Sequence, residues 1–415
     1  MSVTIGIDFG TSFCSASWIN PATGKPDAVR FKDTNSEKLP SIIYVDKLNN
    51  IQVGRVAAYA LEEDAEGVFF TSIKMHMDKR NKWLPQQCTD ADLVSFILKK
   101  VREDVEKSCP ISGTIDKVVL THPVWHDATD GWKKDLLKHA AALAGFKKVK
   151  LLTEPEAAAF YAIKAGVVPE TCKGLLVYDF GGGTFDVSYV QVFSDGQLKT
   201  PVLPQGDPQC GGDDIDRALY AIWDKFILAN MQKSLSPEPG EINEAFMYSC
   251  RRQKEQMSMG GISTELSKYI PTIGRVSMPF TRKDFDKLVN PFIDRTLAKT
   301  KIVLDDIRAK GLPLTHVVLI GGSSNLPQVE PKLQELVGKN VTLRSTGQND
   351  IAVAVGALYS LDIKIEPPKK PEPPKPAEQP KPQPKECFCI YCGKKIMTSH
   401  KVCMYCGKPN FSYKP

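Results

Sequence analysis

Residues 175–189 are Leu175-Leu-Val-Tyr-Asp-Phe-Gly-Gly-Gly-Thr-Phe-Asp-Val-Ser-Tyr189: an apolar strand, a turn of Asp179 and three glycines, and a second strand of alternating pattern. Consecutive glycines weaken the strands around them, so they indicate a backbone that must approach another group closely. A phosphate fits this requirement, because successive backbone N–H groups form an anion-binding nest. Asp179 and Asp186 flank the nest, and carboxylates suit a metal ion held together with the phosphate.

The chain contains this unit twice. Near the amino terminus, Val3-Thr-Ile-Gly-Ile-Asp-Phe-Gly-Thr-Ser-Phe-Cys-Ser-Ala-Ser-Trp18 again runs from an apolar strand through an Asp-Phe-Gly turn and small hydroxyl residues into a strand. Two such hairpins, about half a domain apart, predict duplicated halves that close on one ligand. Strands and helices alternate in both halves, which predicts an α/β fold with a sheet in each half.

Apolar periodicity predicts the helices. An amphipathic helix is expected from Asp90 to Ser108, and another from Gly131 to Gly145. Pro155 occupies the first turn of a further helix, a position that proline favours, so Glu154 is held beside the positive end of that helix. Additional helices are expected at 210–229, 240–258, 283–310 (as one helix or two) and 351–361.

Composition and length are those of a globular protein. The 415 residues are 42% hydrophobic and 25% charged, and they allow two or three domains. No apolar run approaches the roughly 18–20 residues of a membrane helix. The amino terminus enters the first hairpin directly, without room for a signal peptide. We therefore expect a cytoplasmic protein without a membrane partner.

Charge and cysteine are unevenly distributed along the chain. Residues 364–415 contain 11 Lys and 4 Glu and so have a net charge of +7. The net charge of the whole chain is +6, so residues 1–363 have a net charge of about −1. A near-neutral main domain argues against a nucleic-acid surface there. Six of the 11 cysteines are scattered through residues 1–363 without repeated spacing, as buried thiols in a reducing compartment are.

A change of composition after Leu361 predicts a linker. Residues 367–385 contain nine prolines interleaved with Lys and Glu, a composition that cannot pack a core. We expect residues 363–386 to form a semi-rigid spacer that spans roughly 70 Å. A ligand for a proline-binding groove is the alternative interpretation, and we favour the spacer.

The last part of the chain repeats a cysteine motif. Cys389-Ile-Tyr-Cys392-Gly-Lys and Cys403-Met-Tyr-Cys406-Gly-Lys predict a zinc ribbon at 387–415, in which four thiolates hold a structural Zn²⁺. The glycine after each pair lets backbone N–H groups turn towards the sulfurs. A redox-active dithiol pair is the alternative. Cys387 and His400 are further donors that we leave outside the site, and a module of this size needs the metal to fold.

Motif comparison narrows the phosphate chemistry. No Gly-x-x-x-x-Gly-Lys-Ser/Thr sequence is present, which excludes a P-loop, and no Gly-x-Gly-x-x-Gly follows a strand. The motifs that are present resemble those of the actin-like ATPase superfold, specifically the nucleotide-binding domain of the seventy-kilodalton heat-shock chaperone family. They occur in the family's order over residues 1–362: Gly6-Ile-Asp-Phe-Gly-Thr-Ser-Phe13, Glu154-Pro-Glu-Ala-Ala-Ala159, Asp179-Phe-Gly-Gly-Gly-Thr-Phe-Asp-Val-Ser188, Gly211-Gly-Asp-Asp-Ile-Asp216 and Gly321-Gly-Ser-Ser-Asn-Leu-Pro327.

The resemblance implies a cleft between two lobes, 1–174 and 175–362, that binds ATP or ADP with Mg²⁺. Lys74 would reach the γ-phosphate, and the Thr184 hydroxyl would contact it. Asp8 and Asp179 would position Mg²⁺, largely through water. Glu154 and Asp186 would orient the attacking water.

The resemblance also implies the remaining nucleotide contacts. The phosphates would be held from both sides by backbone N–H groups of Gly10, Thr11 and Ser12 and of Gly181, Gly182 and Gly183. Further contacts are implied for Gly211, Gly212, Lys254, Ser258, Gly321, Gly322, Ser323 and Asp350.

The base-binding end departs from the family pattern. The positions that normally supply a Glu to the ribose and an Arg to the adenine face are Arg251 and Glu255 here, and Asn325 replaces a second adenine-stacking Arg. The loss of each stacking guanidinium removes about 0.5–2 kcal/mol. Arg251 and Arg252 are the candidates to compensate, and the preferred base stays open.

The segments that follow the nucleotide-binding domain also differ from the family pattern. The family's leucine-rich linker and peptide-binding β-sandwich are not found after residue 362, so peptide clients cannot be inferred. We expect a slow Mg²⁺-dependent ATPase that acts as a conformational switch, with the zinc ribbon as a docking module for a protein partner. The alternatives are a nucleotide-dependent scaffold without useful turnover and, less favoured, a small-molecule kinase of the same superfold.

Overall fold

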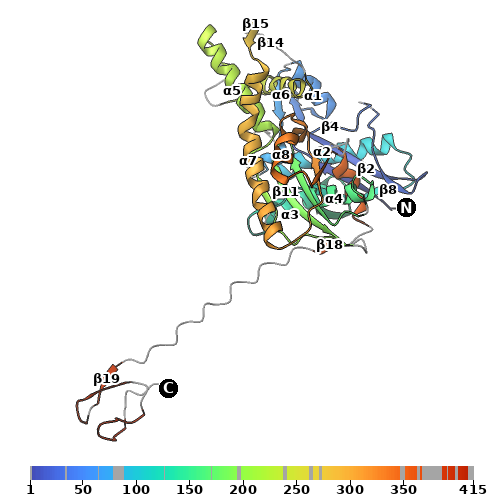
Figure 1. Cartoon of the computed structure of the whole chain (residues 1–415). Helices are drawn as coiled ribbons and strands as arrows, with labels where there is room; N and C mark the ends of the chain where they lie inside the picture. Colours follow the sequence, from blue (N-terminus) through green and yellow to red (C-terminus); the bar gives the residue numbers. More distant parts are fainter. Residues whose placement is uncertain are drawn as a thin grey trace. The chain divides into compact units, whose positions relative to one another are not determined.

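The computed structural model describes most of the chain (Figure 1). The described residues are 2–32, 35–63, 65–77, 88–125, 127–169, 171–193, 198–236, 241–260, 265–270, 273–345, 351–361, 365–366, 386–389, 391–397 and 401–409; for 127, 128, 365, 366, 386 and 387 only the backbone is described. The chain divides into two compact units, Met1–Pro368 and Lys369–Pro415, and each is described by itself. The predicted boundaries of the two lobes (after 174 and 362) and of the spacer (after 386) stay predictions.

The first sheet of the larger unit is built on the amino-terminal hairpin. Its strand order is β3-β2-β1-β8-β9, and β4 pairs with β2. β2 pairs antiparallel with both β1 and β3, whereas β8 and β9 run parallel to β1. The strands are β1 (Ser2–Phe9), β2 (Phe13–Asn20), β3 (Lys25–Ala28), β4 (Leu39–Pro40), β8 (Thr114–His122) and β9 (Lys148–Thr153).

The second sheet repeats this arrangement around the triple-glycine hairpin. Its order is β12-β11-β10-β16-β17, with β18 beside β12 and β13 beside β11. β11 pairs antiparallel with both β10 and β12, and β16 and β17 run parallel to β10. The strands are β10 (Gly174–Phe180), β11 (Phe185–Val192), β12 (Leu198–Lys199), β13 (Gln205–Asp207), β16 (His316–Ile320), β17 (Thr342–Ser345) and β18 (Ile365–Glu366).

The register of the two hairpins is the same. Phe9 pairs with Cys14 and Phe180 with Phe185, so each turn contains four residues between paired strands. One pair further back, Asp8 faces Ser15 and Asp179 faces Asp186. The predicted α/β fold with duplicated halves is therefore confirmed.

Two small sheets are added to the larger unit. The first half carries β5 (Ile43–Asp46), β6 (Ile51–Val53) and β7 (Gly67–Phe70), in the order β6-β5-β7. The second half carries the hairpin of β14 (Glu265–Ile270) and β15 (Gly274–Pro279).

Seven of the described helices correspond to predicted ones, most with shifted ends, whereas the helices at 55–62 and 329–337 were not predicted. The helices are α1 (Arg55–Glu62), α2 (Asp90–Ser108), α3 (Asp127–Leu143), α4 (Glu154–Lys164), α5 (Gly212–Met231), α6 (Glu244–Ser258), α7 (Arg282–Ala309), α8 (Val329–Val337) and α9 (Ala352–Tyr359), with the 3₁₀ turns η1 (Ile73–Met75) and η2 (Gly322–Asn325). α2 has the predicted bounds, because Thr89 and Asp92 form a capping box at its start. α3 begins four residues before the predicted Gly131, since a helix tolerates one glycine at a cost of about 1 kcal/mol.

α7 is one helix although Pro291 lies within it. Its carboxyl-terminal part continues through Val303, Leu304 and Ile307, which are buried, and this packing outweighs the backbone hydrogen bond that proline removes. α7 lies alongside β11 and β13 of the second sheet (Figure 1).

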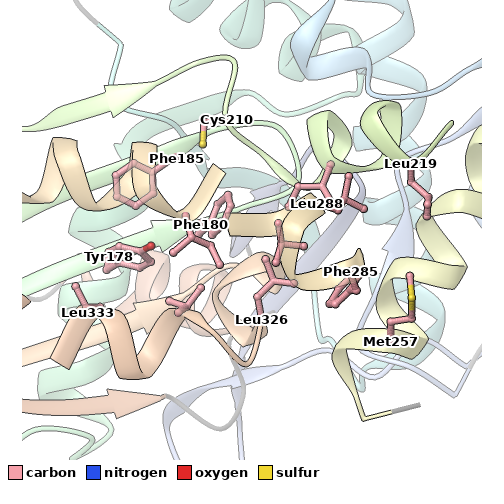
Figure 2. Close-up of a cluster of buried hydrophobic side chains, with 14 of the residues drawn as sticks. Tyr178, Phe180, Phe185, Cys210, Leu219, Met257, Phe285, Leu288, Leu326 and Leu333 are labelled. Atoms are coloured by element: carbon pink, nitrogen blue, oxygen red, sulfur yellow. The ribbon is translucent and has the colours of Figure 1, made fainter. Parts of the chain in front are cut away.

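Each half of the larger unit has its own hydrophobic core. In the second half, one cluster combines strand residues such as Tyr178 and Phe185 with helix residues such as Leu219 and Phe285 (Figure 2). Trp223 of α5 is completely buried in the same cluster. The first half has a corresponding cluster between its sheet and α2 and α3. These cores fix both sheets and therefore the two glycine-containing turns at their ends.

α4 and α9 join the halves. They pack against each other, and α9 also contacts β1, β2, β3 and β8 of the first sheet. The helices form a third core with residues of both sheets, including Val119 and Val177. Gly356 allows the close approach of α9 to α4, since a side chain there would collide with the carbonyl oxygen of Ala157.

The described residues include no helix that combines the length and the apolar character needed to cross a membrane. The smaller unit contains the hairpin of β19 (Glu386–Phe388) and β20 (Lys395–Met397).

Substitution of Gly356 by alanine should destabilise the larger unit by about 1–3 kcal/mol, because the added methyl group overpacks the α4–α9 contact. Gly131 is the matched control: it also lies inside a helix, and nothing stands within 4 Å of its Cβ position. Gly131→Ala should be neutral or stabilise by up to about 1 kcal/mol. Urea unfolding of both variants measures the difference, and equal stabilities would contradict the packing of α4 on α9.

Candidate functional site

A cavity of about 350 Å³ lies where the two hairpin turns meet. Most of the residues predicted to bind or act on a nucleotide line this cavity. They are Asp8, Gly10, Thr11, Ser12, Lys74, Glu154, Asp179, Gly181, Gly182, Gly183, Thr184, Lys254, Ser258, Gly321, Gly322 and Ser323. Asp350 lies outside the described residues.

The two turns approach each other so closely that only glycine fits. A Cβ at Gly182 would lie 2.5 Å from Ser12 Oγ, and one at Gly183 would lie 2.5 Å from Thr11 Oγ1. Gly321 has a φ of 78° and packs against the backbone of Phe180. The glycines thus leave backbone, instead of side chains, around the cavity, as a phosphate site requires.

Gly211 and Gly212 support the triple-glycine turn from outside the cavity lining. The N–H of Gly212 donates to the Gly181 carbonyl at 3.0 Å, and that of Asp213 donates to the Gly182 carbonyl at 2.7 Å. A side chain at Gly211 would collide with the backbone of Gly183. Direct contact of these two glycines with a nucleotide stays a prediction.

Lys74 is buried beside several carboxylates. It is only 9% exposed, and its Nζ forms an ion pair with Glu154. Burial lowers the pKa of Lys74, but Glu154, Asp8 and Asp179 outweigh that effect and raise it above the ordinary value.

The carboxylates belong to both halves and repel one another. Burial, reinforced by Glu154, Asp186 and Asp8, raises the pKa of Asp179 well above its usual range. Burial and Glu154 raise the pKa of Asp186 to about 7, against the effect of a 3.1 Å hydrogen bond from Thr184. Asp8 accepts a hydrogen bond from Thr121 at 3.0 Å. A cluster of buried carboxylates with one lysine is suited to a divalent cation, so these residues fit Mg²⁺ beside a phosphate.

Glu154 is positioned by the start of α4. Thr153 caps this helix: its hydroxyl accepts the N–H of Glu156, and its own N–H donates to the Glu156 carboxylate at 3.1 Å. Glu154 is the first residue of α4 and is buried, which fixes its carboxylate opposite Lys74.

A second and larger cavity, of about 950 Å³, adjoins the first. Lys74, Thr184 and Arg251 line both cavities, whereas Asp186 lines only the second. Asp186 therefore lies beside the first cavity, next to Thr184, which lines both cavities.

The first cavity is also lined by Lys254, Glu255 and Ser258 of α6 and by Asn325 of η2. Both candidate compensating guanidiniums are held by carboxylates. Arg251 binds Asp213 at 2.7 Å and Asp216 at 3.4 Å. Arg252 pairs with Glu62 at 3.1 Å and is not among the described residues that line the cavity.

The smaller unit brings four cysteines together. Cys389 and Cys406 have sulfurs 3.7 Å apart, as have Cys392 and Cys403, and all four sulfurs lie within 4.8 Å of one another. Sulfurs in a tetrahedron around a metal at about 2.3 Å would be about 3.8 Å apart. The side chain of Cys387 and the whole of His400 lie outside the described residues.

The two cysteine loops have the same backbone pattern. The N–H of Cys389 donates to the Lys394 carbonyl at 2.9 Å and that of Gly393 to the Cys389 carbonyl at 2.8 Å; Cys403 and Gly407 repeat both bonds at 2.8 Å. Gly393 and Gly407 have φ values of 68° and 69°, which favour glycine. The backbone N–H groups of Tyr391 and Cys392 lower the pKa of the Cys389 thiol, whereas the neighbouring cysteines raise the pKa of the Cys406 thiol. Thiolates held in this way fit a structural Zn²⁺.

The duplicated sheets, the paired phosphate turns and the carboxylate cluster define a nucleotide-binding domain of the actin-like ATPase architecture. A model of the family described as Hsp70 protein matches residues 72–366. The chain belongs to the Hsp70 family, and its larger unit contains the family's ATP-binding domain. Members of this family bind ATP with Mg²⁺.

Several curated proteins are similar to the chain. It is 29% identical over 368 residues to chaperone protein DnaK of Thermosipho africanus (strain TCF52B), covering 85% of this chain and 58% of that protein. It is 28% identical over 384 residues to chaperone protein DnaK of Nitrosopumilus maritimus (strain SCM1), covering 88% and 56%. The chain thus spans between 56% and 58% of the length of these relatives.

Sequence reasoning missed the ion network around Arg251 and the second cavity. Asp213 and Asp216 belong to a motif already recognised, but their acidic side chains were not connected with the reversed charge at position 251. A signal was present: a cation on the core-facing side of α6 requires a buried carboxylate partner.

The cysteine cluster predicts one zinc ion per chain, measurable by elemental analysis of protein purified without added metal. Cys403→Ser should remove the zinc, because three thiolates and a hydroxyl bind it far more weakly. Cys109→Ser is the matched control, since this half-buried thiol lies outside the cluster. Wild-type protein that contains no metal, yet protects residues 386–409 from proteolysis, would contradict a structural zinc site.

Proposed function

We propose that the chain is a slow Mg²⁺-dependent ATPase in which closure of the two lobes on the nucleotide acts as a switch. The observation that carries this proposal is the buried Lys74–Glu154 ion pair at the meeting point of both glycine turns. A phosphate-binding lysine next to a carboxylate that can orient water is an arrangement suited to phosphoryl transfer.

Each residue of the site would have its own role in ATP hydrolysis. Lys74 offsets negative charge on the terminal phosphate, and the Thr184 hydroxyl contacts the same group. Glu154 and Asp186 orient the water that attacks. Asp8 and Asp179 hold Mg²⁺ through its water shell, and this ion supplies charge neutralisation at the phosphates. Because these carboxylates come from both halves, a bound nucleotide draws the lobes together.

A scaffold that binds nucleotide without useful turnover is the second candidate. It is favoured by the altered base end, where Glu255 and Asn325 stand at the two positions expected to stack on adenine. A small-molecule kinase is the third, favoured by the second cavity, which reaches Lys74 and Thr184 and has room for an acceptor.

The smaller unit would dock a protein partner. Its exposed side chains include Phe388, Tyr391, Met404 and Tyr405, which leaves apolar surface available for contact. The ammonium of Lys394 lies 4.7 Å from the ring centre of Tyr405, and that of Lys408 lies 4.6 Å from the ring centre of Tyr391. These reciprocal contacts hold both tyrosines in place on a basic surface.

Phosphate release by wild-type protein and Lys74→Ala tests the ATPase proposal. Wild type should release phosphate slowly in the presence of Mg²⁺, and Lys74→Ala should be about 10²–10³-fold slower, the usual cost of removing one charge-stabilising donor. Lys47→Ala is the matched control, because Lys47 is exposed and is not among the residues that line the cavity. Equal slow release by wild type and Lys74→Ala would refute hydrolysis and leave the scaffold. Phosphorylation of an added metabolite would favour the kinase.

The base end is tested by restoring the missing guanidiniums. Glu255→Arg and Asn325→Arg should each strengthen ATP binding by about 0.5–2 kcal/mol, or about 2- to 30-fold, because each adds a stacking group. Calorimetric titration with ATP, ADP and GTP measures the gain and the base preference. Glu335→Arg makes the same change of charge as Glu255→Arg at an exposed position of α8 and should have no effect. Unchanged ATP affinity in both cavity variants would place the base elsewhere.

A further inference from the structure

Ser72 has an unusual backbone conformation two residues before Lys74. Its φ of 48° and ψ of 36° lie in the left-handed region, which residues other than glycine seldom occupy. Ser72 is the cap residue that directly precedes η1, and Lys74 is the middle residue of that turn. The direction in which Lys74 projects therefore depends on whatever holds Ser72 in this conformation.

Asp213 holds Ser72 from the other half of the unit. The Ser72 hydroxyl donates a hydrogen bond to Asp213 Oδ2, and both residues are buried. Asp213 lies in the first turn of α5, directly after the two glycines that support the triple-glycine turn. Its own N–H donates to the Gly182 carbonyl. Asp213 is thereby fixed relative to the phosphate end of the cavity.

Arg251 holds Asp213. Its Nη2 donates to Asp213 Oδ1 at 2.7 Å, so the two carboxylate oxygens bind Arg251 and Ser72 separately. The Nε of Arg251 donates to Asp216 Oδ2 at 3.4 Å. Lys254, one turn further along α6, pairs with Asp216 at 2.9 Å and donates to the Gly212 carbonyl at 2.8 Å.

The charges of this network are confined to the interior. Burial lowers the pKa of the Arg251 guanidinium. The nearby carboxylates of Asp213, Asp216 and Glu255 outweigh this effect and raise that pKa above its ordinary value. Burial raises the pKa of Asp216 although Lys254 and Arg251 oppose this. A buried, always-charged guanidinium between two carboxylates has a geometry fixed by its hydrogen bonds, which suits it to orient neighbours.

We propose that Arg251 is a positioning residue: through Asp213 and Ser72 it fixes the 3₁₀ turn that directs Lys74 at Glu154. The chain of contacts connects α6, which lines the base end of the nucleotide cavity with Glu255 and Ser258, to the lysine at its phosphate end. Displacement of α6 therefore displaces Lys74. The effect of this connection on hydrolysis rests on the proposed ATPase function, whereas the placement of Lys74 does not.

A general clamp between the lobes would be a different explanation for the same contacts. Two other pairs also join the halves here: Thr71 donates to Glu244 at 2.8 Å, and Arg252 pairs with Glu62 at 3.1 Å. Arg252 adjoins Arg251 on α6 but does not contact Asp213. Arg252→Met therefore removes a guanidinium and a contact between the halves without breaking the path to Lys74.

The first test measures the placement of Lys74 directly. Reductive methylation of the full-length protein, followed by peptide mass spectrometry, gives the reactivity of each lysine. Lys74 should react slowly in wild type, where its side chain is only 5% exposed. In Arg251→Met and in Ser72→Ala, labelling should rise about fivefold or more, because the turn opens locally. Ser72→Ala removes only a hydroxyl group, so it keeps the test valid if Arg251→Met does not fold. Arg252→Met should label as wild type does.

The second test separates positioning from binding. Under single-turnover conditions Arg251→Met and Ser72→Ala should hydrolyse ATP roughly 10- to 100-fold more slowly, because a small displacement of the Lys74 ammonium from the terminal phosphate slows the reaction. ATP affinity should change by less than about threefold. Arg251→Lys should recover part of the rate, since it restores a cation next to Asp213.

The outcomes distinguish this proposal from the proposed function. Unchanged Lys74 labelling in both Arg251→Met and Ser72→Ala would overturn the positioning role, whatever the ATPase activity. Increased labelling without any difference in phosphate release between wild type and Lys74→Ala would support the positioning role and refute the ATPase. Loss of ATP affinity together with rate in Arg251→Met would assign Arg251 to binding instead, and would overturn the proposal.

Discussion

The ion pair between Lys74 and Glu154 is the interaction on which the site depends. It is the point where a buried cation meets carboxylates contributed by both sheets, and removal of either partner would leave a buried charge uncompensated. Because Asp8, Asp179 and Asp186 repel one another, a cation bound together with an anionic ligand would offset this repulsion. Neither half of the unit holds the full set of these charges.

Duplication explains how such a cluster arises from simple parts. Asp8 and Asp179 occupy the same register position, each one pair before the last of its hairpin, so two copies of one β-unit deliver two carboxylates to one place. The partners of these aspartates differ: Ser15 faces Asp8, whereas Asp186 faces Asp179. The halves are therefore alike in backbone and unlike in charge, and this asymmetry gives the second half the additional carboxylate of the site.

Local patterns allowed much of the fold to be predicted. The hairpins and the helix at 90–108 could be recognised because strand alternation, helix periodicity and capping are encoded over a few residues. The burial of Lys74 could not be read from its neighbours in sequence, because it depends on Glu154, 80 residues away. Arg251 was considered a candidate base contact, yet its orientation is decided by Asp213 and Asp216 on another helix. The start of α3 was misplaced because the glycine inside its first turns was taken as a boundary. The ligand roles of the site residues stay predictions.

The contact of α9 with the first sheet also concerns the order in which the protein can fold during synthesis. The hydroxyl of Ser17 in β2 donates to the carbonyl of Ala354 in α9, across 337 residues of chain. The ribosome therefore releases the amino-terminal sheet long before the helix that covers it is made. Until then the apolar surface that α9 buries, including the small side chains of α4, is open to solvent or to other chains. Contacts this distant in sequence slow folding, so a newly made chain has an extended period in which it is itself prone to aggregate.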